Sequence, residues 1–128
     1  MIARFAFTVL LVATMLLAAA LPAGAAPSPQ AQREIDALIA GLGASGCAFE
    51  RNGHWYDAKT AKAHLQKKYD YLRKRDMADT AELFIERAAS ESSMSGKPYR
   101  VRCPGKSAEP SAQWFRQRLQ ALRAPPKR

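Results

Sequence analysis

Apolar side chains recur along this chain with two spacings, one typical of helices and one typical of strands. In residues 31–42 they follow the i, i+3, i+4, i+7 order of a single buried helical stripe, formed by Ile35, Leu38, Ile39 and Leu42. This spacing predicts a first helix. Its end is predicted at the glycines that follow, which are Gly41, Gly43 and Gly46.

Residues 47–57 are predicted to form a β-hairpin. Asn52 and Gly53 tolerate the positive φ angles of a two-residue type I′ turn. Such a turn pairs Arg51 with His54, Glu50 with Trp55 and Phe49 with Tyr56. Alternation then places Cys47, Phe49 and Tyr56 on one face and leaves Glu50 and Trp55 on the other.

A third strand is predicted at residues 99–103. Tyr99, Val101 and Cys103 alternate with Arg100 and Arg102, which indicates a strand with one buried face and both arginines outward. Pro98 lies where an edge strand can begin. If this strand joins the hairpin, its cysteine can meet the hairpin's cysteine on the core face.

Three more helices are predicted from the helical spacing. The second follows Asp57 as N-cap, and its buried positions are Ala58, Ala61, Leu65, Tyr69 and Leu72. The third is expected to begin with Asp79 and Glu82 as a capping-box variant and to end at Gly96. The fourth is expected to have Pro110 in its first turn and to bury Trp114, Phe115, Leu119 and Leu122. The predicted fold class is α+β, with about four helices packed on a small three-stranded antiparallel sheet.

The N-terminal 25 residues have the order of a secretory signal peptide. One positive charge, at Arg4, precedes an uncharged, mainly apolar run over residues 5–21, and Pro22 follows it. Small residues then predict cleavage after Ala25; cleavage after Ala26 and an uncleaved anchor are the alternatives. The expected organisation is a signal peptide at 1–25, a flexible lead-in at 26–30, one domain at 31–123 and a basic, disordered tail at 124–128.

The two cysteines, Cys47 and Cys103, are predicted to form a disulfide. Their number is even, and an exported chain folds in an oxidising compartment, where cysteines pair. A zinc site is the alternative. It would need His54 and His64 as further ligands, and their spacing matches no standard zinc motif. No metal and no cofactor are expected.

The chain is strongly basic, with 20 Lys+Arg against 11 Asp+Glu and a net charge of +9. Removing Arg4 with the signal lowers the charge to +8, which favours anionic partners. Export makes nucleic acid an unsuitable partner. A basic surface that only keeps the protein in solution is the alternative to a specific site. The candidate binding residues are Trp55, Lys97, Arg100 and Arg102, together with Lys67, Lys68, Arg73 and Lys74 on the second helix.

Four blocks occur in the order F-x-R-N-G (49–53), H-L-x-x-K (64–68), T-A-E-x-F-I (80–85) and S-S-x-S-G-K-P-Y (92–99). Together they resemble the YfeK-like family of small exported bacterial proteins, a domain of unknown function. The resemblance covers nearly all of the mature chain. It implies a setting in the Gram-negative periplasm, and it implies no activity, cofactor or catalytic residue.

Catalysis is the second hypothesis. His64 could act as a general base beside a carboxylate such as Asp57 or Asp70, with serines of the 92–95 segment, among them Ser93 and Ser95. The segment matches neither a Ser-x-x-Lys dyad nor a phosphate loop, and a helix end is the preferred interpretation of it over a ligand loop.

The leading interpretation is a non-catalytic periplasmic domain that is not an integral membrane protein after signal cleavage. It would bind an anionic envelope component, such as a lipid headgroup, lipopolysaccharide or an anionic glycan, or an acidic protein. The alternative is a small hydrolase or transferase that uses His64 and the Ser92–Ser95 loop. A structural subunit would differ from both by an exposed apolar patch that includes Trp114 and Phe115.

Overall fold

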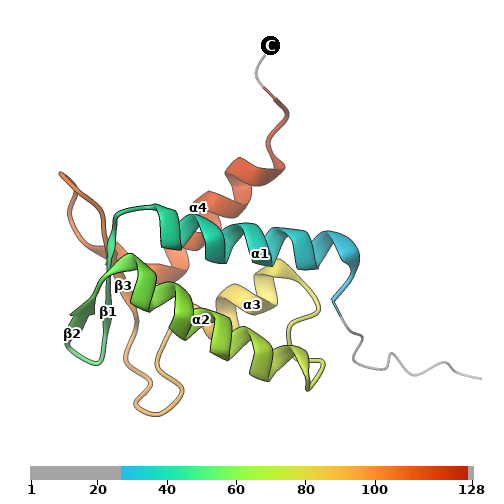
Figure 1. Cartoon of the computed structure of the whole chain (residues 1–128), viewed down its shortest axis with the longest axis horizontal. Helices are drawn as coiled ribbons and strands as arrows, with labels where there is room; N and C mark the ends of the chain where they lie inside the picture. The colour runs from blue at the N-terminus through green and yellow to red at the C-terminus, as the bar shows by residue number, and fades with distance from the viewer. Residues whose placement is uncertain (1–26, 127–128) are drawn as a thin grey trace, which may run out of the picture.

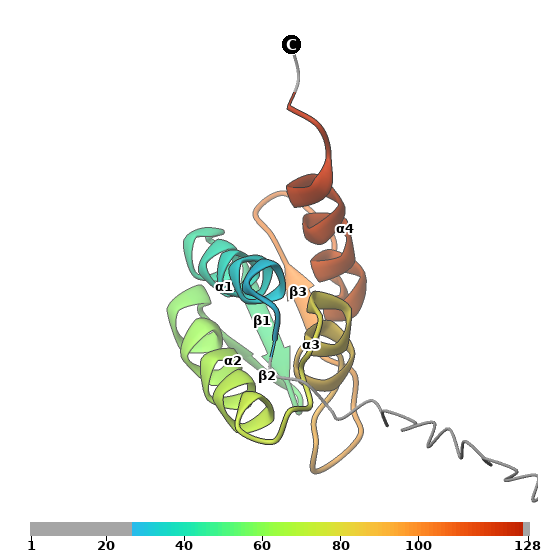
Figure 2. The same cartoon turned by 90° about the vertical axis from the view of Figure 1, so that its right-hand side faces the viewer.

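Four helices and four short strands make up the fold in the computed structural model, which describes residues 27–126. In chain order they are α1 (Pro29–Ala44), β1 (Ala48–Arg51), β2 (His54–Tyr56), α2 (Ala58–Arg73), α3 (Ala81–Ala88), β3 (Arg100–Arg102), β4 (Glu109–Pro110) and α4 (Ser111–Arg123). The sheet lies at one end of the molecule (Figure 1). Figure 2 shows α1 beside α2 and α3 beside α4. The predicted α+β class is confirmed. The predicted signal peptide lies outside the described residues.

The sheet is antiparallel and has the order β2-β1-β3-β4. The predicted hairpin register is confirmed, and the turn residues Asn52 and Gly53 have φ angles of 51° and 81°. The predicted strand at 99–103 pairs with β1, with Val101 opposite Phe49. The prediction of three strands was one too few, because β4 has only two residues, too short to show any alternation, and one of them is Pro110 at the sheet edge.

The first helix differs from the prediction at both ends. It begins at Pro29 rather than within residues 31–42, because the Ser28 hydroxyl accepts a hydrogen bond from the amide of Ala31 (3.1 Å) and caps it. The lead-in predicted at 26–30 is therefore too long. Gly41 and Gly43 lie inside the helix, and the chain leaves it only after Ala44.

The third helix is shorter than predicted. Thr80, and not Asp79, is its N-cap, since its side chain accepts from the amide of Leu83 (3.1 Å). The helix ends at Ala88 instead of Gly96. From there residues 90–98 form a loop, here called the serine loop, closed by backbone bonds from Ser92 N to Lys97 O and from Tyr99 N to Ser90 O (2.9 Å each). The serines therefore belong to a closed loop and do not terminate a helix.

The fourth helix begins one residue later than predicted, with Pro110 as its N-cap. It buries Trp114, Phe115 and Leu119 as expected. Leu122 was expected to pack, but it is 50% exposed. At the end of this helix the Arg123 guanidinium pairs with the carboxylates of Glu34 on α1 and Glu82 on α3. These two pairs tie the C-terminal end of α4 to both neighbouring helices.

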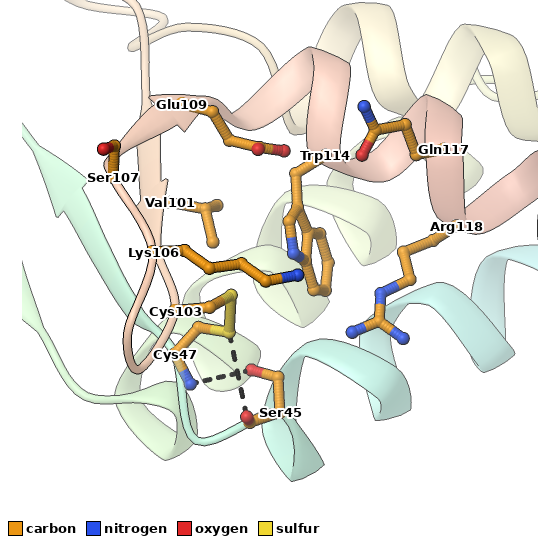
Figure 3. A pocket seen from close by; sticks show the side chains of 10 residues that line it. All are labelled: Ser45, Cys47, Val101, Cys103, Lys106, Ser107, Glu109, Trp114, Gln117 and Arg118. Carbon is orange, nitrogen blue, oxygen red and sulfur yellow. Dashed lines mark hydrogen bonds between the residues drawn. A yellow bond between two sulfur atoms is a disulfide. The ribbon is translucent and has the colours of Figure 1, made fainter.

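The predicted disulfide between Cys47 and Cys103 is confirmed. It links the residue before β1 to the residue after β3, next to the terminal pair of these two strands, Ala48 and Arg102 (Figure 3). The Cys47 amide also donates to the Ser45 hydroxyl (3.0 Å). The disulfide and this hydrogen bond together hold the C-terminal end of α1 against the end of the sheet.

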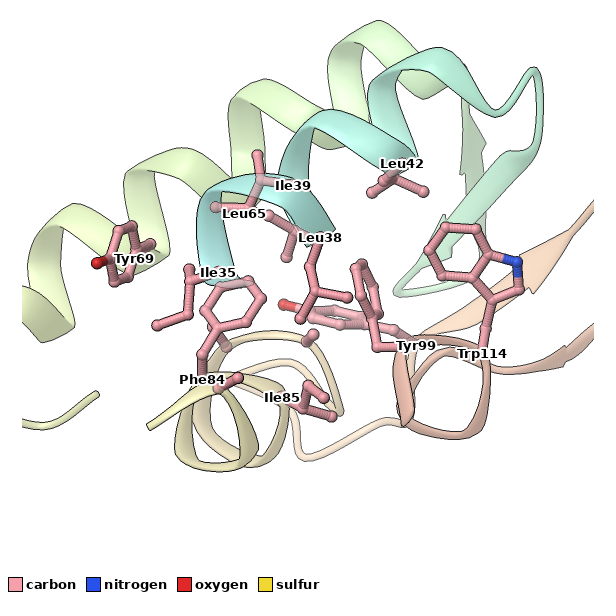
Figure 4. Close-up of a cluster of buried hydrophobic side chains, with 14 of the residues drawn as sticks. Ile35, Leu38, Ile39, Leu42, Leu65, Tyr69, Phe84, Ile85, Tyr99 and Trp114 are labelled. Carbon is pink, nitrogen blue, oxygen red and sulfur yellow. The ribbon is translucent and has the colours of Figure 1, made fainter. Parts of the chain in front are cut away.

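One core is formed by residues from all four helices and the inner face of the sheet (Figure 4). Its largest fully buried side chains are Tyr69, Tyr99, Phe49, Phe84, Phe115, Ile35, Leu38, Ile39, Leu42, Leu65, Ile85 and Val101. Trp114 is only 6% exposed and Phe115 is fully buried, so the surface patch expected for a structural subunit is wrong at both residues. Within residues 27–126 no helix has the length and hydrophobicity needed to cross a membrane.

Candidate functional site

Four polar side chains from three elements meet beside the core; we call them the polar cluster, and they are Arg51, His64, Lys68 and Tyr99. Arg51 Nη1 lies 3.2 Å from His64 Nδ1, and His64 Nε2 lies 3.2 Å from the Tyr99 hydroxyl. Lys68, one turn after His64 on α2, donates to the same hydroxyl (3.1 Å) and to the backbone oxygen of Glu91 (3.2 Å). The cluster therefore joins β1, α2 and the residue just before β3.

The hydrogen bonds of the polar cluster determine the tautomer of His64. A guanidinium can only donate, so Nδ1 of His64 accepts from Arg51 and carries no proton. In the neutral ring the proton is then on Nε2, which donates to the Tyr99 oxygen. Neither ring nitrogen is left to remove a proton from a substrate. This geometry gives no support to His64 as a general base.

Positive charge dominates the surroundings of His64. Burial, followed by the charges of Arg51, Lys68 and Lys67, lowers the pKa of His64 to about 4. Burial, followed by Arg51, lowers the pKa of Lys68 to about 8, and Glu91 partly opposes this. Burial also raises the pKa of Tyr99. Each of these shifts disfavours the charged form of its own group, and burial is the largest cause of all three. Neighbouring cations add to the shifts of His64 and Lys68, whereas Arg51 opposes that of Tyr99.

A pocket opens beside the polar cluster, and we call it the α2 pocket. Its volume is about 390 Å³, within the range of small-molecule sites. Its lining residues are His64, Lys67, Lys68, Tyr71, Leu72, Arg87 and Ser93. Lys67 and Lys68 of α2 and Arg87 of α3 supply cationic groups, and Arg87 also donates to the Met77 carbonyl (2.8 Å). Tyr71 and Leu72 add apolar surface. Tyr71 is 56% exposed, so this surface is open to solvent.

Four of the predicted site residues come together in the α2 pocket: His64, Lys67, Lys68 and Ser93. Other predicted residues do not join them. Arg73 pairs with Asp70 (3.1 Å) near the end of α2, and Lys74 caps that helix end.

Lys97 and Ser95 belong to the serine loop and do not line the α2 pocket. The Ser95 hydroxyl donates to Asn52 Oδ1 (2.6 Å), which ties the loop to the hairpin turn. Ser95 thus has a structural contact. Lys97 is exposed.

Trp55, Arg100 and Arg102 lie on the other face of the sheet, away from the core. The register places Glu50 between Trp55 and Arg100. The Arg102 guanidinium stacks over the Trp55 ring at 4.2 Å from its centre. This outer face is separate from the α2 pocket.

Sequence reasoning missed Arg51, Tyr71 and Arg87, and it assigned Tyr99 to the core alone. One signal was available, because Arg51 falls on the inward alternation of β1 after Cys47 and Phe49, where a charge is unusual. Lys68, one of the predicted binding residues, is half-buried and donates to the Tyr99 hydroxyl. The polar cluster also falls within three of the motif blocks, F-x-R-N-G, H-L-x-x-K and S-S-x-S-G-K-P-Y.

The carboxylates proposed as partners of His64 have other contacts. Asp57 accepts from the amide of Thr60 (2.8 Å) and caps α2, which lowers the pKa of Asp57. Asp70 accepts from Gln66 and Arg73. Among residues 27–126 no group of three or more His, Cys, Asp and Glu side chains could hold a metal ion.

Comparison with known proteins supports the resemblance predicted from the motifs. Residues 29–123 match the family described as "Family of unknown function (DUF5329)". The chain is 39% identical over 88 residues to the "Uncharacterized protein YfeK" of Salmonella typhimurium strain LT2, a stretch that covers 68% of this chain and 72% of that protein. No solved structure matches the chain significantly. The protein therefore belongs to the family of unknown function DUF5329.

Proposed function

We propose that this protein is a non-catalytic binding protein of the periplasm and that the α2 pocket binds the anionic group of an envelope component. One observation carries the proposal. Lys67, Lys68 and Arg87 line one pocket with Arg51 behind it, and none of these four cations has an ion-pair partner among the described residues. An anion would supply the missing negative charge.

The electrostatics favour an anion over a neutral ligand. The lowered pKa values of His64 and Lys68 result in part from neighbouring cations. A bound phosphate or carboxylate would offset this repulsion and would accept hydrogen bonds from ammonium and guanidinium groups. Lys68, with a pKa of about 8, is mainly protonated at pH 7 and can serve as one of these donors.

The shape of the pocket indicates what the anion is attached to. Tyr71 and Leu72 form an apolar wall next to the cationic groups. A ligand that carries an apolar chain or ring beside its charge would cover both surfaces at once. The ligand class is therefore an amphiphilic anion, and membrane lipid or a free amphiphile could supply it. The disulfide is consistent with an oxidising compartment, where such envelope molecules are found.

The test is binding of the chain without its first 25 residues, because all described elements and the whole core lie after Pro27. The probes are hexyl phosphate, inorganic phosphate, and vesicles of phosphatidylcholine with or without phosphatidylglycerol. We expect hexyl phosphate to bind more tightly than inorganic phosphate. Binding to the anionic vesicles alone would identify a membrane surface as the source of the anion.

Matched variants separate a site from general basicity. Lys67→Gln and Arg87→Gln remove pocket charges, whereas Lys74→Gln removes one charge from the same helix outside the pocket. We expect the pocket variants to weaken hexyl phosphate binding about tenfold and Lys74→Gln to leave it unchanged. Equal losses in all three variants, or no binding of any probe, would refute the proposal. A loss confined to Arg102→Gln would instead move the site to the outer sheet face.

A further inference from the structure

A second pocket lies between the disulfide and α4, and we call it the disulfide pocket (Figure 3). Its volume is about 370 Å³. The Cys47–Cys103 bond and Trp114 form its apolar surfaces, while Lys106 and Glu109 come from the segment between β3 and α4 and Arg118 comes from α4. It shares no lining residue with the α2 pocket.

Opposite charges line the disulfide pocket without pairing. Lys106, Arg118 and Glu109 form no ion pair within 4.0 Å in the described part of the chain. Oε1 of Glu109 is also buried and has no hydrogen-bond partner there. A buried carboxylate oxygen without a partner is unfavourable, so this atom favours a ligand that donates a hydrogen bond.

The surface between these charges is rigid and apolar. Trp114 is 6% exposed and packs edge-to-face on Phe115, with ring centres 4.9 Å apart. The Arg118 guanidinium lies over the Trp114 ring at 4.7 Å, which orients the cation at the pocket wall. The disulfide holds the opposite wall. The pocket thus presents cations and a carboxylate with an apolar surface between them.

We propose that the disulfide pocket binds a small zwitterion, an α-amino acid. Its carboxylate would be held by Lys106 and Arg118, its ammonium group would donate to Glu109, and its side chain would lie against Trp114. A simple anion fits less well, because Glu109 would repel it, and a simple cation would be repelled by the two basic groups. This site is independent of the α2 pocket.

Three related probes separate the parts of this interaction. L-Leucine carries both charges, N-acetyl-L-leucine lacks the ammonium group, and L-leucinamide lacks the carboxylate. In the variant Trp55→Phe, Trp114 is the single tryptophan left in the chain, so its fluorescence reports on this pocket alone. We expect saturable binding of leucine with a dissociation constant of about 1 mM and binding about tenfold weaker for each derivative.

Two carboxylate variants in the same Trp55→Phe background complete the test. Glu109→Gln removes the charge in the pocket, whereas Glu86→Gln removes an exposed charge on α3. We expect Glu109→Gln to weaken leucine binding about tenfold and to strengthen the binding of N-acetyl-leucine, because it removes the charge that repels this anion, while Glu86→Gln changes neither. Unchanged thermal melting will show that both variants fold. Equal binding of the three probes, leucine binding unaffected by Glu109→Gln, or no saturable signal would overturn the proposal. Lys68→Gln changes the α2 pocket only, so its result distinguishes the two sites.

Discussion

Acidification is expected to destabilise this protein through His64. The pKa of His64 in the folded protein is about 4, below its usual value of 6.5, because the ring is partly buried among cations. The unfolded chain therefore takes up a proton first as the pH falls. The contribution of His64 to stability is complete above pH 6.5 and is lost as the pH falls toward 4.

The size of the effect follows from the same two values. One pKa unit corresponds to about 1.36 kcal/mol, so the interval from 6.5 to about 4 sets an upper limit of about 3 kcal/mol. At pH 5 about 2 kcal/mol of this would be lost. His64 keeps contact with solvent, and screening reduces the expected loss at pH 5 to about 1 kcal/mol.

Urea unfolding at pH 7, 6 and 5 measures this loss, with His64→Gln as the comparison. Glutamine can still accept from Arg51 and donate toward Tyr99, but it does not titrate. Carboxylates such as Glu34, whose pKa is lowered by Arg123, titrate alike in both proteins and cancel. We expect the parent to lose about 1 kcal/mol more than the variant between pH 7 and 5. Parallel losses, or an NMR titration of His64 near pH 6.5, would refute the reasoning.

Three further predictions concern the fold. Replacing both Cys47 and Cys103 with serine should lower the free energy of unfolding by up to about 4 kcal/mol, because the disulfide closes a loop across 56 positions. Urea unfolding of the parent and the variant under non-reducing conditions measures this loss. Thr80→Ala should lower the free energy of unfolding by about 1 kcal/mol, whereas Asp79→Ala should not lower it, because only Thr80 caps α3. The urea midpoints of the two variants test this, and a larger loss in Asp79→Ala would contradict the structure. Gly53→Ala should cost about 1 kcal/mol, because φ is +81° there; a thermal melt unchanged from the parent would be the contrary result.

Local signals predicted much of the fold correctly. The turn Asn52-Gly53 determined the hairpin and its register, because a two-residue loop permits only one pairing of the flanking residues. The alternation around Val101 likewise identified β3 and its inward cysteine. In both cases the sequence pattern that predicts the element lies within a few residues, although β3 forms its ladder with the distant strand β1.

The predictions failed where distant residues decide the outcome. The apolar spacing of α3 does not show that the chain leaves the helix at Ala88, because the bonds that close the serine loop depend on Tyr99 and Lys97 meeting Ser90 and Ser92. The polar cluster was missed for the same reason. The bond between His64 and Tyr99 spans 35 positions, and only the packing of α2 against the sheet brings those two residues together.

The two proposed sites lie near the two ends of β3. Tyr99, just before this strand, carries the hydrogen bonds of the polar cluster beside the α2 pocket, and Cys103, just after it, lines the disulfide pocket. Tyr99 is also held by backbone bonds to Ser90 and Ser111 (2.9 Å each), which do not depend on the disulfide. Loss of the disulfide should therefore loosen the disulfide pocket far more than the α2 pocket. The two sites lie near opposite ends of one strand, but each is fixed by its own set of contacts.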